Sequence, residues 1–165
     1  MIQKLKQQDC FCLDTETTGL DPKTVELIGF SFCWEAGTAC YLPVNGKGGL
    51  PDSVVRDKLS AILTNPNIKK VGHNLKYDLS VLAWNGYTVS GPFIDTMILH
   101  SLVKPGQKHG MDVVAEALLG YTPVSIESLI GPKGKDQHSM KDVPLAALAE
   151  YAAEDADVTW QLFEN

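Results

Sequence analysis

Two carboxylates, Asp14 and Glu16, stand one residue apart just after the short apolar run at residues 10–13. Alternate residues of a β-strand point to the same face, so both side chains are expected to project together. Carboxylates held that close repel each other unless one takes up a proton or a cation lies between them. We therefore expect a cation site at the end of this strand, where the turn at residues 17–20 takes the chain out of the sheet.

A third carboxylate, Asp155, lies within the apolar stripe of a helix whose first turn contains Pro144. The stripe consists of Leu145, Leu148, Ala152, Asp155, Thr159 and Leu162. A carboxylate that faces the core is costly unless it is paired, hydrogen-bonded or bound to metal. Tyr151 lies one turn earlier on the same side, where its hydroxyl can orient a water molecule beside Glu16. A buried Asp155 held by an amide or a lysine, with Tyr151 as a core residue, explains this helix equally well.

The fourth carboxylate, Asp78, lies on a helix that we expect the Asn74 side chain to cap. The apolar residues of this helix are Leu75, Leu79 and Leu82. Asp78 follows the strand expected at residues 68–72, at the sheet edge where open α/β sheets build sites. On its own, Asp78 is more readily explained as a solvated acid on the helix surface.

Taken together, the four acids match a site that binds two metal ions and hydrolyses a phosphodiester. Carboxylate oxygens suit Mg²⁺ or Mn²⁺, with Zn²⁺ as an alternative at one of the two positions. The four cysteines show no Cys-x-x-Cys spacing and are expected to be buried thiols of a cytosolic protein. The formal charge of −6 would become −2 with two divalent ions, so it does not exclude a nucleic-acid substrate.

The order of the remaining patterns predicts one α/β domain over residues 1–165, with a mixed five-stranded sheet flanked by helices. The expected strands lie at residues 10–13, 25–34, 38–44, 68–72 and 93–94, and the first three form an antiparallel meander. Helices are expected from Pro51, from Asn74, after Asp95, at 111–119 and from Pro144. No apolar run approaches the roughly 20 residues of a membrane span. We expect no signal peptide, because the first six residues contain no apolar core of the right length.

Three strings carry a resemblance to a known family: Asp-Thr-Glu-Thr-Thr-Gly-Leu from Asp14, Asn-Leu-Lys-Tyr-Asp from Asn74, and Tyr-Ala-Ala-Glu-Asp-Ala-Asp from Tyr151. They are similar to the three motifs of the four-acid (DEDD) exonuclease superfamily, in its tyrosine subclass. More narrowly, the chain resembles the proofreading domain of bacterial DNA polymerase I. The resemblance implies a ribonuclease H-like fold and removal of nucleotides from a DNA 3′ end.

The resemblance also implies roles for individual residues. Asp14, Glu16 and Asp155 would hold the metal on the nucleophile side, and Asp14 with Asp78 would hold the second. Leu20 would wedge against the terminal bases, and Asn74 and Tyr77 would lie along the single strand. The other residues expected at the substrate are Thr15, Thr17, Ile126, Lys133 and Lys135, with Ile126 at a position where relatives carry an aromatic residue.

Lys104, Lys108 and Lys141 are further candidates for phosphate contact, although each lysine is equally well explained as a solvated loop residue. The expected partners are a single-stranded DNA 3′ end and a polymerase domain in the same, longer chain, with no membrane. The alternatives are an RNA 3′-end processor resembling RNase D, a catalytically silent scaffold and, less favoured, a small-molecule or calcium-binding module.

Overall fold

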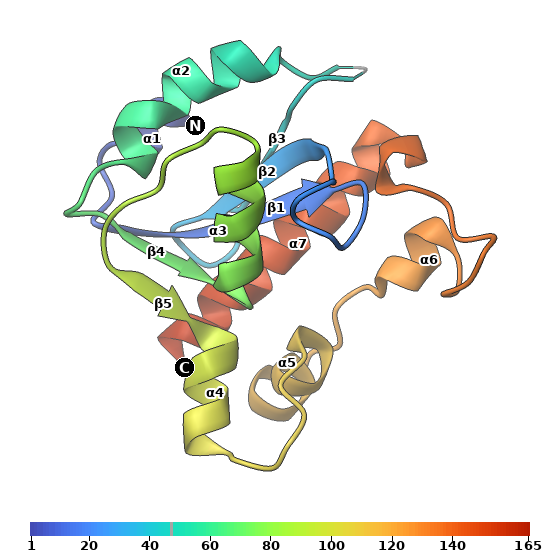
Figure 1. Cartoon of the computed structure of the whole chain (residues 1–165). Helices are drawn as coiled ribbons and strands as arrows, with labels where there is room; N and C mark the ends of the chain where they lie inside the picture. The colour runs from blue at the N-terminus through green and yellow to red at the C-terminus, as the bar shows by residue number, and fades with distance from the viewer. Residues whose placement is uncertain (47) are drawn as a thin grey trace.

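A five-stranded mixed sheet forms the centre of the molecule (Figure 1). The computed structural model describes residues 1–46 and 48–165. The strands lie side by side in the order β3-β2-β1-β4-β5. Their bounds are β1 Cys10–Thr17, β2 Leu27–Cys33, β3 Cys40–Pro43, β4 Lys69–Gly72 and β5 Phe93–Asp95. β1, β2 and β3 pair antiparallel, whereas β4 pairs parallel with both β1 and β5. The predicted mixed sheet is therefore confirmed, with β1 in the middle.

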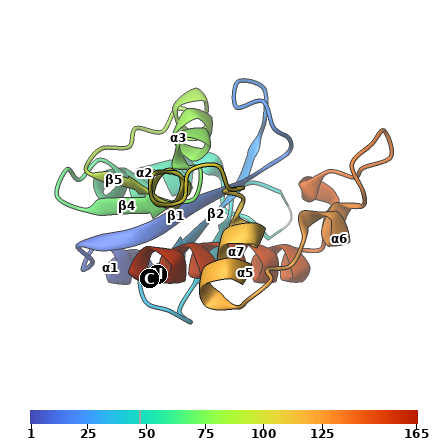
Figure 2. The ribbon, with the colours of Figure 1, turned by 90° about the horizontal axis from the view of Figure 1, so that it is seen from below.

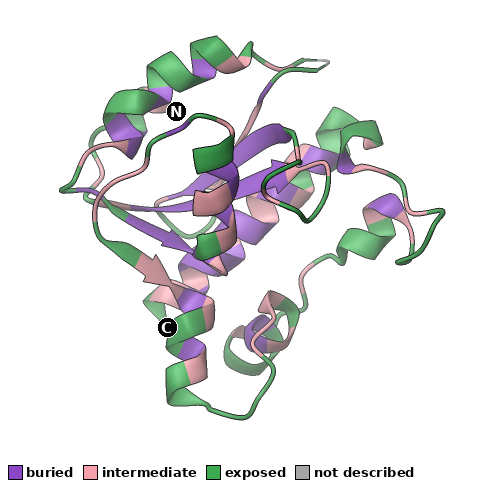
Figure 3. Cartoon of the chain, in the orientation of Figure 1, coloured by how far each residue is buried: buried purple, intermediate pink, exposed green. Residues whose placement is uncertain are grey.

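Helices cover both faces of this sheet, as Figure 2 shows. The long helix α7, Leu145–Glu164, runs under β1 and β2, and α5, Met111–Leu119, packs on it. The helices α2, Asp52–Leu63, and α3, Leu75–Trp84, lie over the opposite face. Every residue of β2 is buried because both of its faces are covered (Figure 3).

The main apolar core lies between the sheet and α2. Its aromatic part is Phe11, Phe30 and Phe32, and α2 contributes the predicted stripe of Val55, Leu59, Ile62 and Leu63. On the other face, Cys12 and Cys33 pack against Ala156 and Trp160 of α7. The strand β1, which carries the first two acids, lies between these two layers.

The strand β1 is longer than predicted, because its pairing with β2 continues to Thr17. Asp14 and Glu16 therefore lie within the paired strand and not just after it. The register changes at this point, since Glu16 pairs with Gly29 while Thr17 pairs with Leu27. Ile28 is the extra residue of a β-bulge, which lies directly beside Glu16.

The helix boundaries follow the sequence closely, with one exception. Asp95 caps α4, Thr96–Val103, by accepting hydrogen bonds from the backbone N–H groups of Met97 and Ile98. Asn74 is the N-cap residue of α3, as predicted, but the capping hydrogen bond expected from its side chain is not formed. Asn74 adopts a left-handed conformation with φ 63°, its side chain makes no cap bond, and its own N–H donates to Asp95 Oδ1.

Three short helical segments were not expected from the sequence. They are α1, Ile2–Leu5, α6, Ile126–Ile130, and the 3₁₀ turn Met140–Asp142. Ser125 caps α6 through the N–H of Glu127. In the described part of the chain, no helix combines the length and the apolar character that a membrane crossing needs.

Candidate active site

Asp14 and Glu16 project from β1 toward the face that α7 covers. Asp14 pairs across the strands with Ser31, and Ser31 Oγ donates to Asp14 Oδ2 at 3.2 Å. Residues directly opposite each other on neighbouring strands share a face, so Ser31 and Gly29 lie beside the two acids. These small residues place no bulky β2 side chain beside the two acids, and the ring of Tyr41 occupies the space over Gly29.

Asp155 reaches the same place from α7, where it is 8 % exposed. It belongs to the buried side of that helix with Leu148, Ala152 and Thr159, as the periodicity predicted, although Leu145 at the start of the stripe is exposed. Tyr151, one turn earlier, is half-buried. Burial raises the pKa of the Tyr151 hydroxyl, and the charges of Asp155 and Glu16 raise it further. Tyr151 therefore remains a neutral donor next to these two acids.

Asp78 is buried too, with 3 % exposure, so it is not a solvated surface acid. Thr15 holds it: the Thr15 N–H donates to Asp78 Oδ1 at 3.0 Å and the Thr15 hydroxyl donates to the same oxygen at 2.6 Å. The side chain of Thr15, which was expected at the substrate, is 7 % exposed and anchors this carboxylate. Successive strand residues point to opposite faces, which explains how Thr15 meets α3 while its neighbours meet α7.

The four carboxylates lie within electrostatic reach of one another. Burial raises the pKa of Asp14 to about 6. Burial, followed by the charge of Asp14, raises the pKa of Asp155 to about 8. Burial also holds the pKa values of Glu16 and Asp78 well above their usual range, and the charge of Asp14 is again the second cause. Asp14 is thus the neighbour that all three other acids share. None of the ion pairs among the described residues involves any of the four.

The donor set fits divalent cations in its chemistry. It offers carboxylate oxygens, which Mg²⁺ and Mn²⁺ prefer as ligands, and a bound cation would relieve the repulsion between their charges. In residues 1–46 and 48–165, however, no three Asp, Glu, His or Cys side chains are arranged as a ready-made metal site. Asp78 is turned toward Thr15, and Asp14 toward Ser31.

Thr17 and Tyr77, both expected at the substrate, shape the turn that follows β1. Their hydroxyls lie 2.9 Å apart, and each donates to the carbonyl of Gly19, at 2.8 Å from Thr17 and 2.7 Å from Tyr77. The next residue, Leu20, is 86 % exposed. The turn therefore holds an apolar side chain in solvent near the acids, as a wedge against bases requires.

The remaining substrate candidates lie on separate segments. Ile126 begins α6 and is 36 % exposed, and Lys133 and Lys135 are exposed in the loop after it. Among the described residues, no hydrogen bond or ion pair links these side chains to the four acids. Lys141, considered for phosphate contact, forms an exposed ion pair with Glu26. Lys104 and Lys108 are exposed.

Sequence reasoning missed the residues that hold the site in place. Ser31 donates a hydrogen bond to Asp14, and Asp95 accepts one from the backbone N–H of Asn74. Tyr41 lies near Glu16: burial raises the pKa of the Tyr41 hydroxyl, and the charge of Glu16 raises it further. One signal was available: the alternating small residues Gly29 and Ser31 interrupt an otherwise apolar strand. That pattern marks the strand face beside the acids.

Comparison with known proteins identifies the family of the chain. A family model described as 3′-5′ exonuclease matches residues 1–165. The DNA polymerase I of Chloroflexus aurantiacus is 37 % identical over 169 residues, which cover all of this chain and 18 % of that protein. The DNA polymerase I of Pseudomonas aeruginosa is 34 % identical over 172 residues, covering 99 % of this chain and 19 % of that protein. The chain thus spans about a fifth of the length of these relatives.

Among solved structures, Brucella melitensis NrnC with bound Mg²⁺ is similar with a TM-score of 0.71 and 27 % identity, covering 96 % of this chain and 71 % of that one. Escherichia coli RNase D shares the fold, with a TM-score of 0.72 at 22 % identity, covering 99 % of this chain and 40 % of that one. The ribonuclease H-like fold is therefore present, and the family match extends over the whole chain. We conclude that the chain belongs to the 3′-5′ exonuclease family, in the form of the domain that DNA polymerase I carries.

Proposed function

We propose that the chain removes nucleotides from the 3′ end of single-stranded DNA by hydrolysis that depends on two divalent cations. The observation that supports this most strongly is the meeting of four carboxylates from three elements, β1, α3 and α7. Glu16, Asp78 and Asp155 are buried and Asp14 is partly buried, and no ion pair among the described residues gives any of the four a cationic partner. Such an accumulation of charge is stable only if protons or cations neutralise it.

In this proposal Asp14, Glu16 and Asp155 hold one cation, and Asp14 with Asp78 holds the other. Asp14 is the shared ligand because its charge acts on each of the other three acids. When bound, Mg²⁺ or Mn²⁺ would activate the attacking water and neutralise charge on the scissile phosphate. Ser31 and Thr15 orient Asp14 and Asp78, so that the ligand oxygens do not have to be ordered during the reaction.

Tyr151 is assigned to the attacking water. Its hydroxyl is neutral at working pH and lies near both Asp155 and Glu16, so it can donate a hydrogen bond that orients the water. Leu20, held in solvent by the Thr17–Tyr77 turn, would press against the terminal base. Contacts with the rest of the single DNA strand are assigned to Asn74, Ile126, Lys133 and Lys135.

The relatives support the proposals of a DNA substrate and of a polymerase domain as partner. Both reported sequence relatives are DNA polymerase I, and this chain matches about a fifth of each. We assign the domain to proofreading beside a polymerase domain of the same longer chain, in the bacterial cytoplasm. RNA is the main alternative substrate, and the two are distinguished by whether the site accepts a 2′-hydroxyl.

The proposal is tested with matched 5′-labelled DNA and RNA oligonucleotides of one sequence, incubated with the protein and Mg²⁺ or Mn²⁺. We expect the DNA to shorten from its 3′ end, the RNA to shorten more slowly, and EDTA to stop both reactions. Asp155→Asn keeps the size of the side chain but removes its charge, and it should abolish shortening.

Asp57→Asn serves as the matched control, because Asp57 is exposed on α2 over the opposite face of the sheet. A wild-type rate in Asp155→Asn would contradict the assignment of the site. Faster degradation of RNA would contradict the DNA substrate but leave the site in place. Calorimetric titration with Mn²⁺ adds a second measure, since failure to bind would support a catalytically silent scaffold.

A further inference from the structure

The β-bulge beside Glu16 is held by a residue from the third strand. Ile28, the extra residue of the bulge, presents its carbonyl oxygen to the Tyr41 hydroxyl, which donates to it at 3.0 Å. The same carbonyl accepts the N–H of Val44 at 2.8 Å. Bulges interrupt the ladder and redirect the strand, so these two bonds from the β3 segment fix how β2 passes Glu16.

The ring of Tyr41 occupies the space over Gly29. A Cβ atom at Gly29 would lie 2.1 Å from the Tyr41 hydroxyl oxygen and 2.2 Å from two ring carbons, so any side chain at this position would require the Tyr41 ring to move. Gly29 is the residue directly opposite Glu16 in the pairing of β1 and β2. The phenol of Tyr41 therefore occupies the space that a side chain at position 29 would take, on the face of the sheet to which Glu16 also points.

Tyr41 also lines a neighbouring cavity. The cavity has a volume of about 880 Å³, and Tyr41, Ile28 and Leu148 contribute to its wall. None of the four acids is among the described residues that line it. Burial raises the pKa of the Tyr41 hydroxyl and the charge of Glu16 raises it further, so this hydroxyl lies near the Glu16 carboxylate.

We propose that Tyr41 is a positioning residue for Glu16: its hydroxyl fixes the bulge at Ile28, and its ring, packed over Gly29, limits the positions that the Glu16 carboxylate can adopt. Tyr41 acts through Glu16 and does not contact the substrate. This role adds a residue to the proposed exonuclease site, and its expected effect on kcat rests on the proposed function. The positional consequence for Glu16 does not depend on that function.

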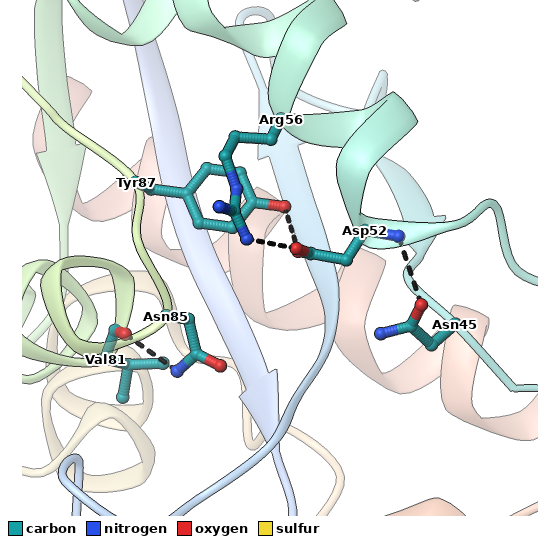
Figure 4. Close-up of polar contacts among 6 residues, drawn as sticks. All are labelled: Asn45, Asp52, Arg56, Val81, Asn85 and Tyr87. Carbon is teal, nitrogen blue, oxygen red and sulfur yellow. Dashed lines mark hydrogen bonds and ion pairs between the residues drawn. The ribbon is translucent and has the colours of Figure 1, made fainter.

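The test compares Tyr41→Phe with Tyr87→Phe, which removes a similar hydrogen bond beside the same strand. Tyr87 donates to Asp52 Oδ1 at 2.6 Å, lies under the guanidinium of Arg56 (Figure 4), and packs against Phe30 on the other face of β2. Each variant should lower the melting temperature by about 2–4 °C. The two variants therefore have a similar expected loss of thermal stability, but only Tyr41 lies near Glu16.

We expect Tyr41→Phe to lower kcat on single-stranded DNA by about three- to tenfold and to weaken Mn²⁺ binding, with KM unchanged. Tyr87→Phe should leave kcat, KM and Mn²⁺ affinity unchanged. Gly29→Ala should lower kcat at least as much as Tyr41→Phe, because the new methyl group displaces the ring. If Tyr41→Phe keeps wild-type kcat and Mn²⁺ affinity while its melting temperature falls as in Tyr87→Phe, the role of Tyr41 is only structural and the proposal is overturned.

A third readout separates this proposal from the exonuclease function itself. The carboxyl ¹³C chemical shift of Glu16 is measured in the metal-free protein at one pH. It should change in Tyr41→Phe and stay constant in Tyr87→Phe, even if the wild-type protein cleaves nothing. An unchanged shift in Tyr41→Phe would overturn the positional role whatever the activity shows, whereas a wild-type protein without activity would overturn only the proposed function.

Discussion

Thr15 gives Asp78 two hydrogen bonds on a single carboxylate oxygen, although 63 residues separate them in the chain. One comes from the backbone of β1 and the other from the side chain, so the position of Asp78 is tied to the strand that carries Asp14 and Glu16. Helix α3 and strand β1 thereby bring their acids together as one unit. The coupling explains why a buried acid on α3 is tolerated: its oxygen has partners even when no cation is bound.

Thr15→Val removes the hydroxyl and keeps the shape and the strand preference of the side chain. We expect the free energy of unfolding to fall by about 1–3 kcal/mol, because a buried carboxylate loses one of its donors. Nucleotide release should slow by about tenfold as Asp78 loses its orientation. Urea unfolding and the rate on labelled DNA measure the two effects. Thr15→Ser, which retains the hydroxyl, should stay close to wild type, and equal losses in both variants would contradict the role of the hydroxyl.

The buried acids predict how the stability of the metal-free protein depends on pH. Folding raises the pKa of Asp14 to about 6 and that of Asp155 to about 8, both above their values in the unfolded chain. A raised pKa means that the folded state holds the proton more tightly, so this stabilisation is complete below about pH 4. It is lost as the pH rises through 6 and then 8. Bound Mn²⁺ should reverse the trend, because it binds the ionised carboxylates.

Urea unfolding in EDTA at pH 5, 6.5 and 8 checks this dependence. Wild-type stability should fall relative to that of Asp155→Asn over this range, since the variant lacks one of the titrating groups. Taking the difference removes the contribution of His73, whose pKa burial lowers and which therefore acts in the opposite direction. A difference that stays constant with pH would contradict the raised pKa of Asp155.

Local periodicity was sufficient to find the acids and much of the fold. The i, i+2 spacing placed Asp14 and Glu16 together, and the helical stripe placed Asp155 in the core. The helix at residues 111–119, closed by a left-handed Gly120, is confirmed at both ends. These features depend on neighbours within a few positions, which a single sequence displays directly.

The features that were missed depend on contacts between distant segments. The bulge at Ile28 results from the register between β1 and β2, which local sequence patterns did not predict. The left-handed Asn74 is held by Asp95 from the next strand, so its side chain has no capping role. Lys141 is engaged by Glu26, which lies 115 positions away. Charge and propensity give no information on such pairs before the fold is known.

Tyr151→Phe should separate orientation of the water from binding of the metal. The hydroxyl is removed while the ring remains packed with Ile130 and Leu148. We expect kcat to fall by about tenfold or more and Mn²⁺ affinity, measured by calorimetry, to stay within about twofold of wild type. A loss of metal affinity as large as the loss of kcat would show that the hydroxyl supports the ligands and does not act on the water.

The fully buried Lys70 gives the last prediction, which concerns stability alone. Its ammonium donates to the carbonyl oxygens of Asn65, Ile68 and Ser90, at 2.7, 2.9 and 2.5 Å. Three donors thus meet three acceptors. Lys70→Met fills the same space but leaves three carbonyls without a donor, which should cost about 3 kcal/mol or more in urea unfolding. Lys69→Met, at the exposed neighbouring position, should change stability by less than about 0.5 kcal/mol, and similar losses in both variants would contradict the importance of these bonds.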